Sequence, residues 1–218
     1  MPSAREALLD AAYTALLTRA WADVRMVEVA AAAGVSRQTL YNEFGSKDGL
    51  ARALVRRETE TYLAGVERAL APGDAGPAGP TDDAAARMTA AATWTLRTAR
   101  ANPLVRAALT GCWGDRLPAG QAGPAELVGR FRERAVAALA PGRPREELPA
   151  LDAACETAAR LTLSCVVAPA GPERAPDPVR LPADVRVTVP RQRMRRESEG
   201  ETEAVSRLVR GAFAGLTG

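Results

Sequence analysis

Histidine is absent from this sequence of 218 residues, and several other residue types are scarce. The lack of histidine excludes Ser-His-Asp and Cys-His catalysis, imidazole zinc sites and a histidine pH switch. Aromatic residues make up only 4% of the chain, so its core must consist mainly of alanine, leucine and valine. Lys47 is the only lysine among 29 basic residues. The net charge of +3 is too small to indicate a nucleic-acid-binding protein from composition alone.

The three cysteines, Cys112, Cys155 and Cys165, are an odd number and lack CxxC spacing. With no recognisable signal peptide, this pattern predicts reduced thiols in a cytoplasmic protein, without metal or cofactor. Buried thiols are the favoured interpretation, and a redox role stays open for Cys112. The longest apolar run, near Leu161–Ala170, is too short to span a bilayer, so no membrane partner is expected.

Proline and glycine divide the chain into segments of helical character. These segments are rich in alanine, leucine, arginine and glutamate and poor in β-branched runs, which predicts an all-α protein of one large or two small domains. Val185–Val189 alternates like a strand but is isolated among prolines, so it is predicted to be a loop or a lone extended piece. The expected helices cover residues 3–19, 26–33, 37–44, 47–70, 81–101, 103–111, 125–140, 145–168 and 197–216.

Residues 26–50, MVEVAAAAGVSRQTLYNEFGSKDGL, predict a helix-turn-helix. Ala30 is small enough for two short helices to cross closely, and Gly34 suits a tight turn that needs a positive φ. Leu40 lies on the inner face of the next helix, and Ser36 is placed to cap the start of that helix. In this arrangement the second helix lies in the major groove of DNA.

The segment resembles the N-terminal domain of the tetracycline-repressor (TetR) family of bacterial transcriptional regulators. The matching pieces are ALLDAAYTALL, VAAAAGVSRQTLYNEFGSK and the leucine-containing helix that follows, over about residues 5–55. The resemblance implies a helix-turn-helix DNA-binding domain at 1–50 and a helical effector-binding and dimerisation domain at 51–218. It further implies a homodimeric repressor on double-stranded DNA at a palindromic operator, released by a small-molecule effector.

The second helix of this motif has outward side chains suited to DNA. Gln38 and Asn42 are four residues apart and share one face, where each amide can pair with adenine. Arg37 can reach a guanine edge or a phosphate. By the resemblance, Tyr41 and Lys47 contact phosphates. The predicted DNA-binding residues are Arg25, Ser36, Arg37, Gln38, Thr39, Tyr41, Asn42 and Lys47.

Two positions depart from the family pattern. Ala20 stands where the family usually ends the first helix with glycine, and a left-handed alanine there costs up to about 1 kcal/mol. Arg25 stands where the family usually has threonine, so a guanidinium replaces the capping hydroxyl and can contact phosphate instead.

The resemblance places an effector site in the C-terminal domain. Ligand cavities in helical bundles are mostly apolar, so the large or soft side chains of the mid-chain helices are the candidates, with a plain core role as the alternative. Few polar groups are available there, which favours a neutral or cationic lipophilic effector. The candidates are Met88, Trp94, Leu109, Cys112, Trp113, Phe131 and Cys155.

The last two long helices have apolar faces that fit a four-helix dimer interface. Between them, residues 169–196 are proline-rich and end in RQRMRR. One interpretation is a basic arm that binds DNA or an acidic partner. The interpretation that we favour is a solvated disordered excursion. The predicted interface residues are Ala154, Ala158, Leu161, Val205, Leu208, Val209 and Phe213.

Other functions fit the sequence less well. An enzyme or redox sensor with a helix-turn-helix appendage is the alternative, but the chain lacks histidine and Gly-rich phosphate loops. An architectural DNA-coating protein needs a much more basic chain.

Overall fold

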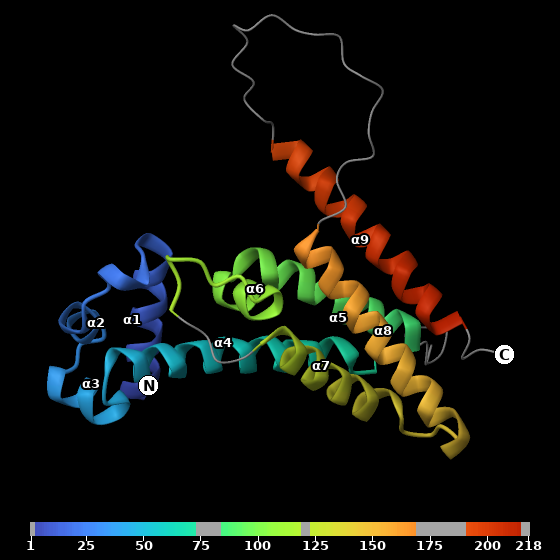
Figure 1. The fold of residues 1–218 in the computed structure, drawn as a ribbon, viewed down its shortest axis with the longest axis horizontal. Coiled ribbons are helices and arrows are strands. Elements are labelled where there is room, and N and C mark those ends of the chain that lie inside the picture. Colours follow the sequence, from blue (N-terminus) through green and yellow to red (C-terminus); the bar gives the residue numbers. More distant parts are fainter. Residues whose placement is uncertain (1–2, 73–83, 119–122, 169–190, 215–218) are drawn as a thin grey trace, which may run out of the picture. The chain divides into compact units, whose positions relative to one another are not determined.

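The computed structural model describes residues 3–72, 84–118, 123–168 and 191–214, and every regular element in these ranges is helical, as predicted. None of the described helices is both long and apolar enough to cross a membrane. Short 3-10 turns are formed by η1 (Trp21–Asp23) and η2 (Arg145–Glu147). The α-helices (Figure 1) are α1 Ala4–Thr18, α2 Met26–Ala32, α3 Arg37–Phe44, α4 Lys47–Leu70, α5 Ala84–Ala101, α6 Pro103–Thr110, α7 Pro124–Leu139, α8 Leu148–Val167 and α9 Arg191–Phe213.

The start of α9 corrects the predicted boundary of the proline-rich segment. The helix begins at Arg191, so the residues RQRMRR are helical rather than part of a loop. Arginine, glutamine and methionine are good helix formers, and no proline follows Pro190, so the helix extends back to that point. The rest of the predicted excursion, including Val185–Val189, lies outside the described residues.

The chain divides into two compact units. The first comprises Met1–Gly65 and Thr98–Arg130, and the second comprises Val66–Arg97 and Phe131–Gly218. Each unit therefore combines segments that are distant in the sequence. The predicted boundary at residue 50 separates a DNA-binding domain from an effector-binding and dimerisation domain. This functional division stays a prediction.

The first unit is built around a core that α1 to α4 share. Leu8, Leu9, Ala12 and Leu16 are buried on one side of α1, because they recur every three or four residues along the helix. Leu104 of α6 joins the same core. The helices of the helix-turn-helix motif thus share one core with α1, with the first part of α4 and with Leu104 of α6.

A buried polar cluster connects three helices of this unit. Glu58 of α4 is 8% exposed and accepts hydrogen bonds from Arg57 (2.8 Å) and from the Asn102 amide (2.6 Å). Arg57 also donates to Asp10 of α1 at 2.6 Å. The Asn102 side-chain oxygen accepts from the first free N–H groups of α6. Each partner satisfies the others, which is the condition under which a buried carboxylate is tolerated.

The second unit contains α8 and α9, which lie side by side (Figure 1). Leu151 and Cys155 of α8 and Val205 and Val209 of α9 are buried. Arg87 of α5 donates to the carbonyl oxygens of Leu70, at 2.6 Å, and of Ala138, at 2.8 Å. One guanidinium thereby satisfies carbonyl groups near the C-terminal ends of α4 and α7, which have no partner in their own helices.

The junction between α3 and α4 depends on a close approach at Gly49. A Cβ added at this residue would lie 1.9 Å from the carbonyl oxygen of Phe44, in the last turn of α3. No real pair of such atoms approaches so closely, so only glycine lets the first turn of α4 lie against the end of α3.

We expect Gly49→Ala to destabilise the protein by about 1–3 kcal/mol, because α3 and α4 must separate to admit the methyl group. Gly129→Ala in α7 is the matched control, because a Cβ there meets no neighbouring atom within 4 Å. This control should raise stability by up to about 1 kcal/mol. Urea unfolding followed by circular dichroism measures both, and equal stability of the two variants would contradict the close approach.

Candidate nucleic-acid interface

Helix α3 is fixed by its cap and by two buried side chains. Ser36 precedes the helix, and its hydroxyl oxygen accepts from the Thr39 N–H at 3.0 Å, as predicted. Leu40 is fully buried and Phe44 is 9% exposed, so this face of α3 packs on the core. The opposite face is turned outward. On it, the side chains of Arg37, Gln38, Tyr41 and Asn42 are exposed.

Two tight turns set the direction of α3. Gly34 has a φ of 68°, in the left-handed region, which confirms the prediction of a glycine turn between α2 and α3. Gly45, directly after α3, has a φ of 71° and was not predicted. The signal that would have revealed it is a glycine one residue past the last apolar position of the helix, where a helix commonly ends.

The amides of Gln38 and Asn42 lie together on the exposed face. The Gln38 side-chain N–H₂ donates to the Asn42 side-chain oxygen at 2.8 Å. This pairing leaves the Gln38 oxygen free to accept and the Asn42 N–H₂ free to donate. Each of these free groups can bond a base edge in the major groove.

The hydroxyl groups near the start of α3 have partners within the protein. The Ser36 and Thr39 hydroxyl oxygens are 2.8 Å apart, in addition to the capping bond. The Arg37 guanidinium lies over the Tyr41 ring, 5.9 Å from its centroid, one helical turn further on. Tyr41 is nevertheless 39% exposed.

Lys47, the first residue of α4, is anchored by the η1 turn. Its ammonium group donates to the Ala22 carbonyl oxygen at 2.8 Å and lies 5.6 Å from the centre of the Trp21 ring. These contacts fix the position of the only lysine charge of the chain beside the start of α4, where backbone N–H groups are also free.

The two departures from the family pattern are accommodated without strain. Ala20 has a φ of −66° and a ψ of 148°, so it is extended rather than left-handed and the expected cost does not arise. Arg25 occupies the N-cap position of α2, and its side chain makes no capping hydrogen bond. The exposed Arg25 side chain is therefore available to solvent or to a ligand.

One contact that holds α3 was not predicted from the sequence. Arg5 of α1 donates to the Glu43 carbonyl oxygen at 3.3 Å and to its carboxylate at 3.2 Å. The same guanidinium lies 4.6 Å from the centre of the Phe44 ring. Arg5 therefore holds the last turn of α3 by charge, hydrogen bond and stacking. The partners are 38 residues apart, and no local pattern connects them.

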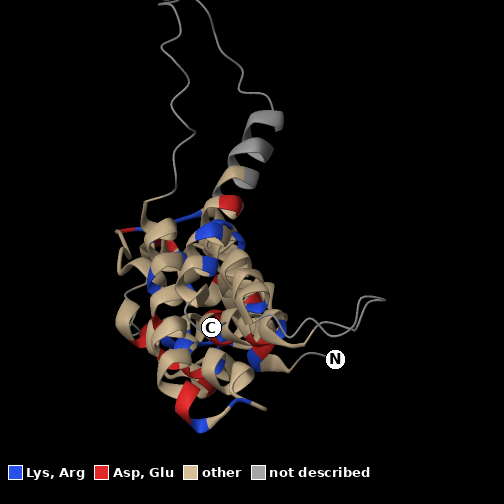
Figure 2. Cartoon of the chain, turned by 90° about the vertical axis from the view of Figure 1, so that its right-hand side faces the viewer, with Lys and Arg blue, Asp and Glu red and all other residues tan. Residues whose placement is uncertain are grey.

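Charges of both signs are spread over the described part of the chain. In the described part of the chain, Figure 2 shows basic and acidic residues interspersed along the helices. Attraction to DNA must therefore come from a few positioned side chains rather than from the net charge.

The helix-turn-helix part of the chain is similar to a known family of regulators. Residues 8–54 match the family model of bacterial regulatory proteins of the tetR family. This segment of the chain belongs to the tetR family. The matched range runs from α1 into α4 and contains the whole helix-turn-helix.

Two curated relatives resemble parts of the chain. The HTH-type transcriptional regulator AlkX of Mycobacterium tuberculosis is 46% identical over 66 residues, which are 30% of this chain and 31% of AlkX. An uncharacterised HTH-type transcriptional regulator of the same species is 34% identical over 143 residues, 65% of each chain. The chain thus matches less than two thirds of the length of either relative.

Solved tetR-family structures resemble nearly the whole chain. The TetR-family repressor AlkX from Dietzia sp., implicated in biodegradation of n-alkanes, is 25% identical with a TM-score of 0.50, and 96% of each chain is covered. A tetR-family regulator from Streptomyces coelicolor is 18% identical with a TM-score of 0.51, covering 98% of this chain and 90% of that one. The latter likeness shows the fold alone.

The residues predicted to bind an effector are divided between the two units of the chain. Leu109, Cys112 and Trp113 belong to the first, and Cys112 is exposed while Trp113 packs against the core that contains α1 to α3. The other four residues belong to the second unit, and they are Met88, Trp94, Phe131 and Cys155. Trp94 is partly exposed, and the other three are buried. That these seven residues form one effector-binding site remains a prediction.

Cys155 has the properties of a core thiol. Its side chain is fully buried, and burial, followed by the nearby Asp152 carboxylate, raises its pKa to about 12. The thiolate needed for oxidation is scarce at neutral pH with such a pKa. The environment of Cys155 therefore offers no support for redox sensing at this residue.

The residues predicted at the dimer interface differ in exposure within one chain. Leu208 is 42% exposed and Leu161 is half-buried. The others already pack within the chain, because an apolar stripe indicates burial but not the partner that buries it. These buried residues are Ala154, Ala158, Val205, Val209 and Phe213.

Proposed function

We propose that this tetR-family chain is a homodimeric transcriptional repressor that binds a palindromic operator through α3 and dissociates when a small molecule binds. The observation that carries the proposal is the two-sided character of α3. Leu40 fixes the helix against the core, while Gln38 presents an acceptor and Asn42 presents a donor outward. A short helix held in this way is the usual reader of base edges in the major groove.

The relatives support the regulatory part of the proposal. The similar Dietzia protein is a repressor, and its implication in n-alkane biodegradation is consistent with the lipophilic effector favoured from the sequence. A gel shift with the DNA upstream of the chain's own gene tests the proposal. A complex that survives excess random competitor DNA is expected, and equal competition by random DNA would contradict it.

We expect Gln38→Ala and Asn42→Ala each to cost about 1–3 kcal/mol in binding to the operator, because each removes hydrogen bonds to a base. Binding to random DNA should barely change. Fluorescence anisotropy with both DNAs measures the difference. The control is Thr14→Ala, an exposed position on α1. Equal losses on operator and random DNA would mean that these amides do not read bases.

We expect Lys47→Gln to weaken binding to all DNA sequences and to lower the salt slope of the affinity by about 1 per subunit, because one phosphate loses its cation. Glutamine keeps a donor for the Ala22 carbonyl oxygen, so the variant separates charge from the internal contact. Arg97→Gln, an exposed position on α5, is the control. An unchanged slope for Lys47→Gln would remove Lys47 from the phosphate contacts.

We expect Leu208→Asp to dissociate the dimer, because a carboxylate would be buried in an apolar interface. Phe213 and Val209 are unsuitable for this test because their burial within the chain makes a folding defect the first effect. Leu17→Asp, at another exposed leucine, is the matched control. In sedimentation experiments Leu208→Asp should behave as a folded monomer, and an intact dimer would place the interface elsewhere.

A further inference from the structure

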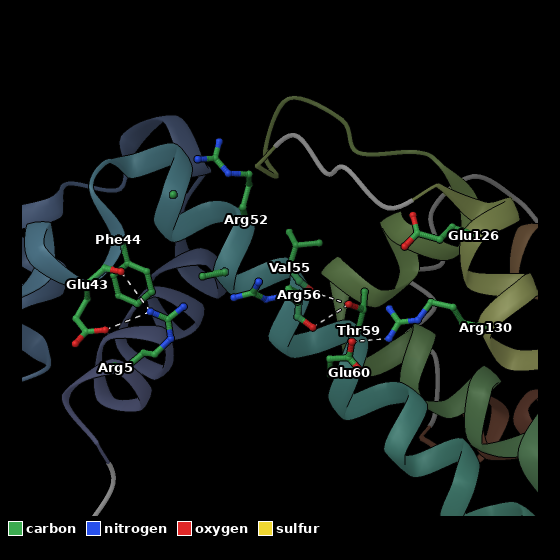
Figure 3. A pocket seen from close by; sticks show the side chains of 12 residues that line it. Arg5, Glu43, Phe44, Arg52, Val55, Arg56, Thr59, Glu60, Glu126 and Arg130 are labelled. Carbon is green, nitrogen blue, oxygen red and sulfur yellow. Dashed lines mark hydrogen bonds and ion pairs between the residues drawn. The ribbon is translucent and has the colours of Figure 1, made fainter. Parts of the chain in front are cut away.

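The candidate DNA-binding surface has two parts that are held separately. Arg5 of α1 bonds the last turn of α3 at Glu43, as Figure 3 shows. Lys47, at the start of α4, is held instead by the η1 turn, through the Ala22 carbonyl oxygen and the Trp21 ring. The position of the Lys47 charge therefore depends on what fixes η1.

The η1 turn is bonded by residues 111–118, the segment that directly follows α6, which we call the strap. The Trp21 N–H donates to the Arg116 carbonyl oxygen at 2.8 Å. Trp21 is the first residue of η1, so its N–H has no acceptor within the turn. The strap supplies this acceptor from a distant part of the sequence.

Apolar side chains hold the strap in place. Trp113 and Leu117 are half-buried and pack against the core of the first unit, to which Trp21 and Val24 also belong. Trp21 is 7% exposed and Val24 is 3% exposed. The strap and η1 thus share one core, and a loss of packing at Leu117 loosens the segment that carries the acceptor of the Trp21 N–H.

The two groups that hold Lys47 move together with η1. The Ala22 carbonyl group and the Trp21 ring belong to one short 3-10 turn, so a shift of the Trp21 backbone displaces both of them. A lysine side chain has many rotamers, and fixing it before binding lowers the entropic cost of a phosphate contact. The Leu117 side chain has no group that bonds a phosphate oxygen, so its effect on DNA must pass through other residues.

We propose that the strap positions Lys47 for contact with a DNA phosphate, and that Leu117 is a positioning residue that acts through Trp21. The proposal rests on the proposed DNA-binding function, which assigns Lys47 to a phosphate. Two measurements separate the proposals, because one follows Lys47 in the free protein and the other follows binding to DNA.

Nuclear magnetic resonance of the full chain with isotope-labelled lysine follows Lys47 directly, because the chain has no other lysine. In the wild type, the Trp21 ring should shift the signals of the Lys47 side chain upfield. Leu117→Ala should return these signals toward those of a free lysine side chain. Unchanged signals in Leu117→Ala would overturn the proposal, whatever the result with DNA.

DNA titrations of a double-mutant cycle connect the strap to the phosphate contact. Leu117→Ala should weaken binding roughly threefold to tenfold at about 0.1 M salt, because the contact of one cation is impaired. In the Lys47→Gln background the same change should have no further effect, since the charge that the strap positions is absent. Equal losses in both backgrounds would overturn the proposal.

Failure of the phosphate contact itself has a different signature. If Lys47→Gln binds DNA as tightly as the wild type, the proposed phosphate contact and the effect of the strap on DNA are both overturned. The lysine signals of Leu117→Ala still decide whether the strap holds Lys47 in the free protein.

Cys112→Ser is the matched control, because Cys112 is an exposed and uncharged residue of the strap. It should match the wild type in both measurements. Leu117→Met keeps the apolar volume and should restore most of the affinity. All variants are compared below their thermal unfolding transitions. If Leu117→Ala does not fold, Leu117→Val, which removes less of the side chain, takes its place with the same criteria.

Discussion

A recognition helix of eight residues cannot stand alone, because two helical turns are too short to be stable in water. The structure therefore depends on how firmly its neighbours hold α3. Leu40 and Phe44 fix it from the core, Gly49 allows α4 to lie against its end, and Arg5 binds its last turn. Each of these contacts comes from a different part of the first unit.

The same contacts explain how a nearly neutral protein can present the proposed DNA-binding surface. Because the inner face of α3 is fixed, the Gln38 and Asn42 amides are held outward as a pair. The η1 turn holds Lys47 at the start of the next helix. Positioned groups of this kind do not require a high net charge.

Local sequence patterns were sufficient for much of this region. The bounds of α3, the Ser36 cap, the turn at Gly34 and the burial of Leu40 all follow from spacing and residue type over a few positions. Contacts between distant segments were not accessible in this way, and the Arg5–Glu43 pair is the clearest case. The stripes of α8 and α9 show the same limit, because Phe213 and Leu208 look alike in sequence while only one is buried.

A crystal structure of the protein bound to DNA selected from a random pool would show directly what α3 contacts. We expect two copies on a palindromic site, with α3 in the major groove and the Gln38 and Asn42 amides within hydrogen-bond distance of base edges. A complex in which α3 faces away from the DNA, or in which these amides contact only phosphates, would contradict it.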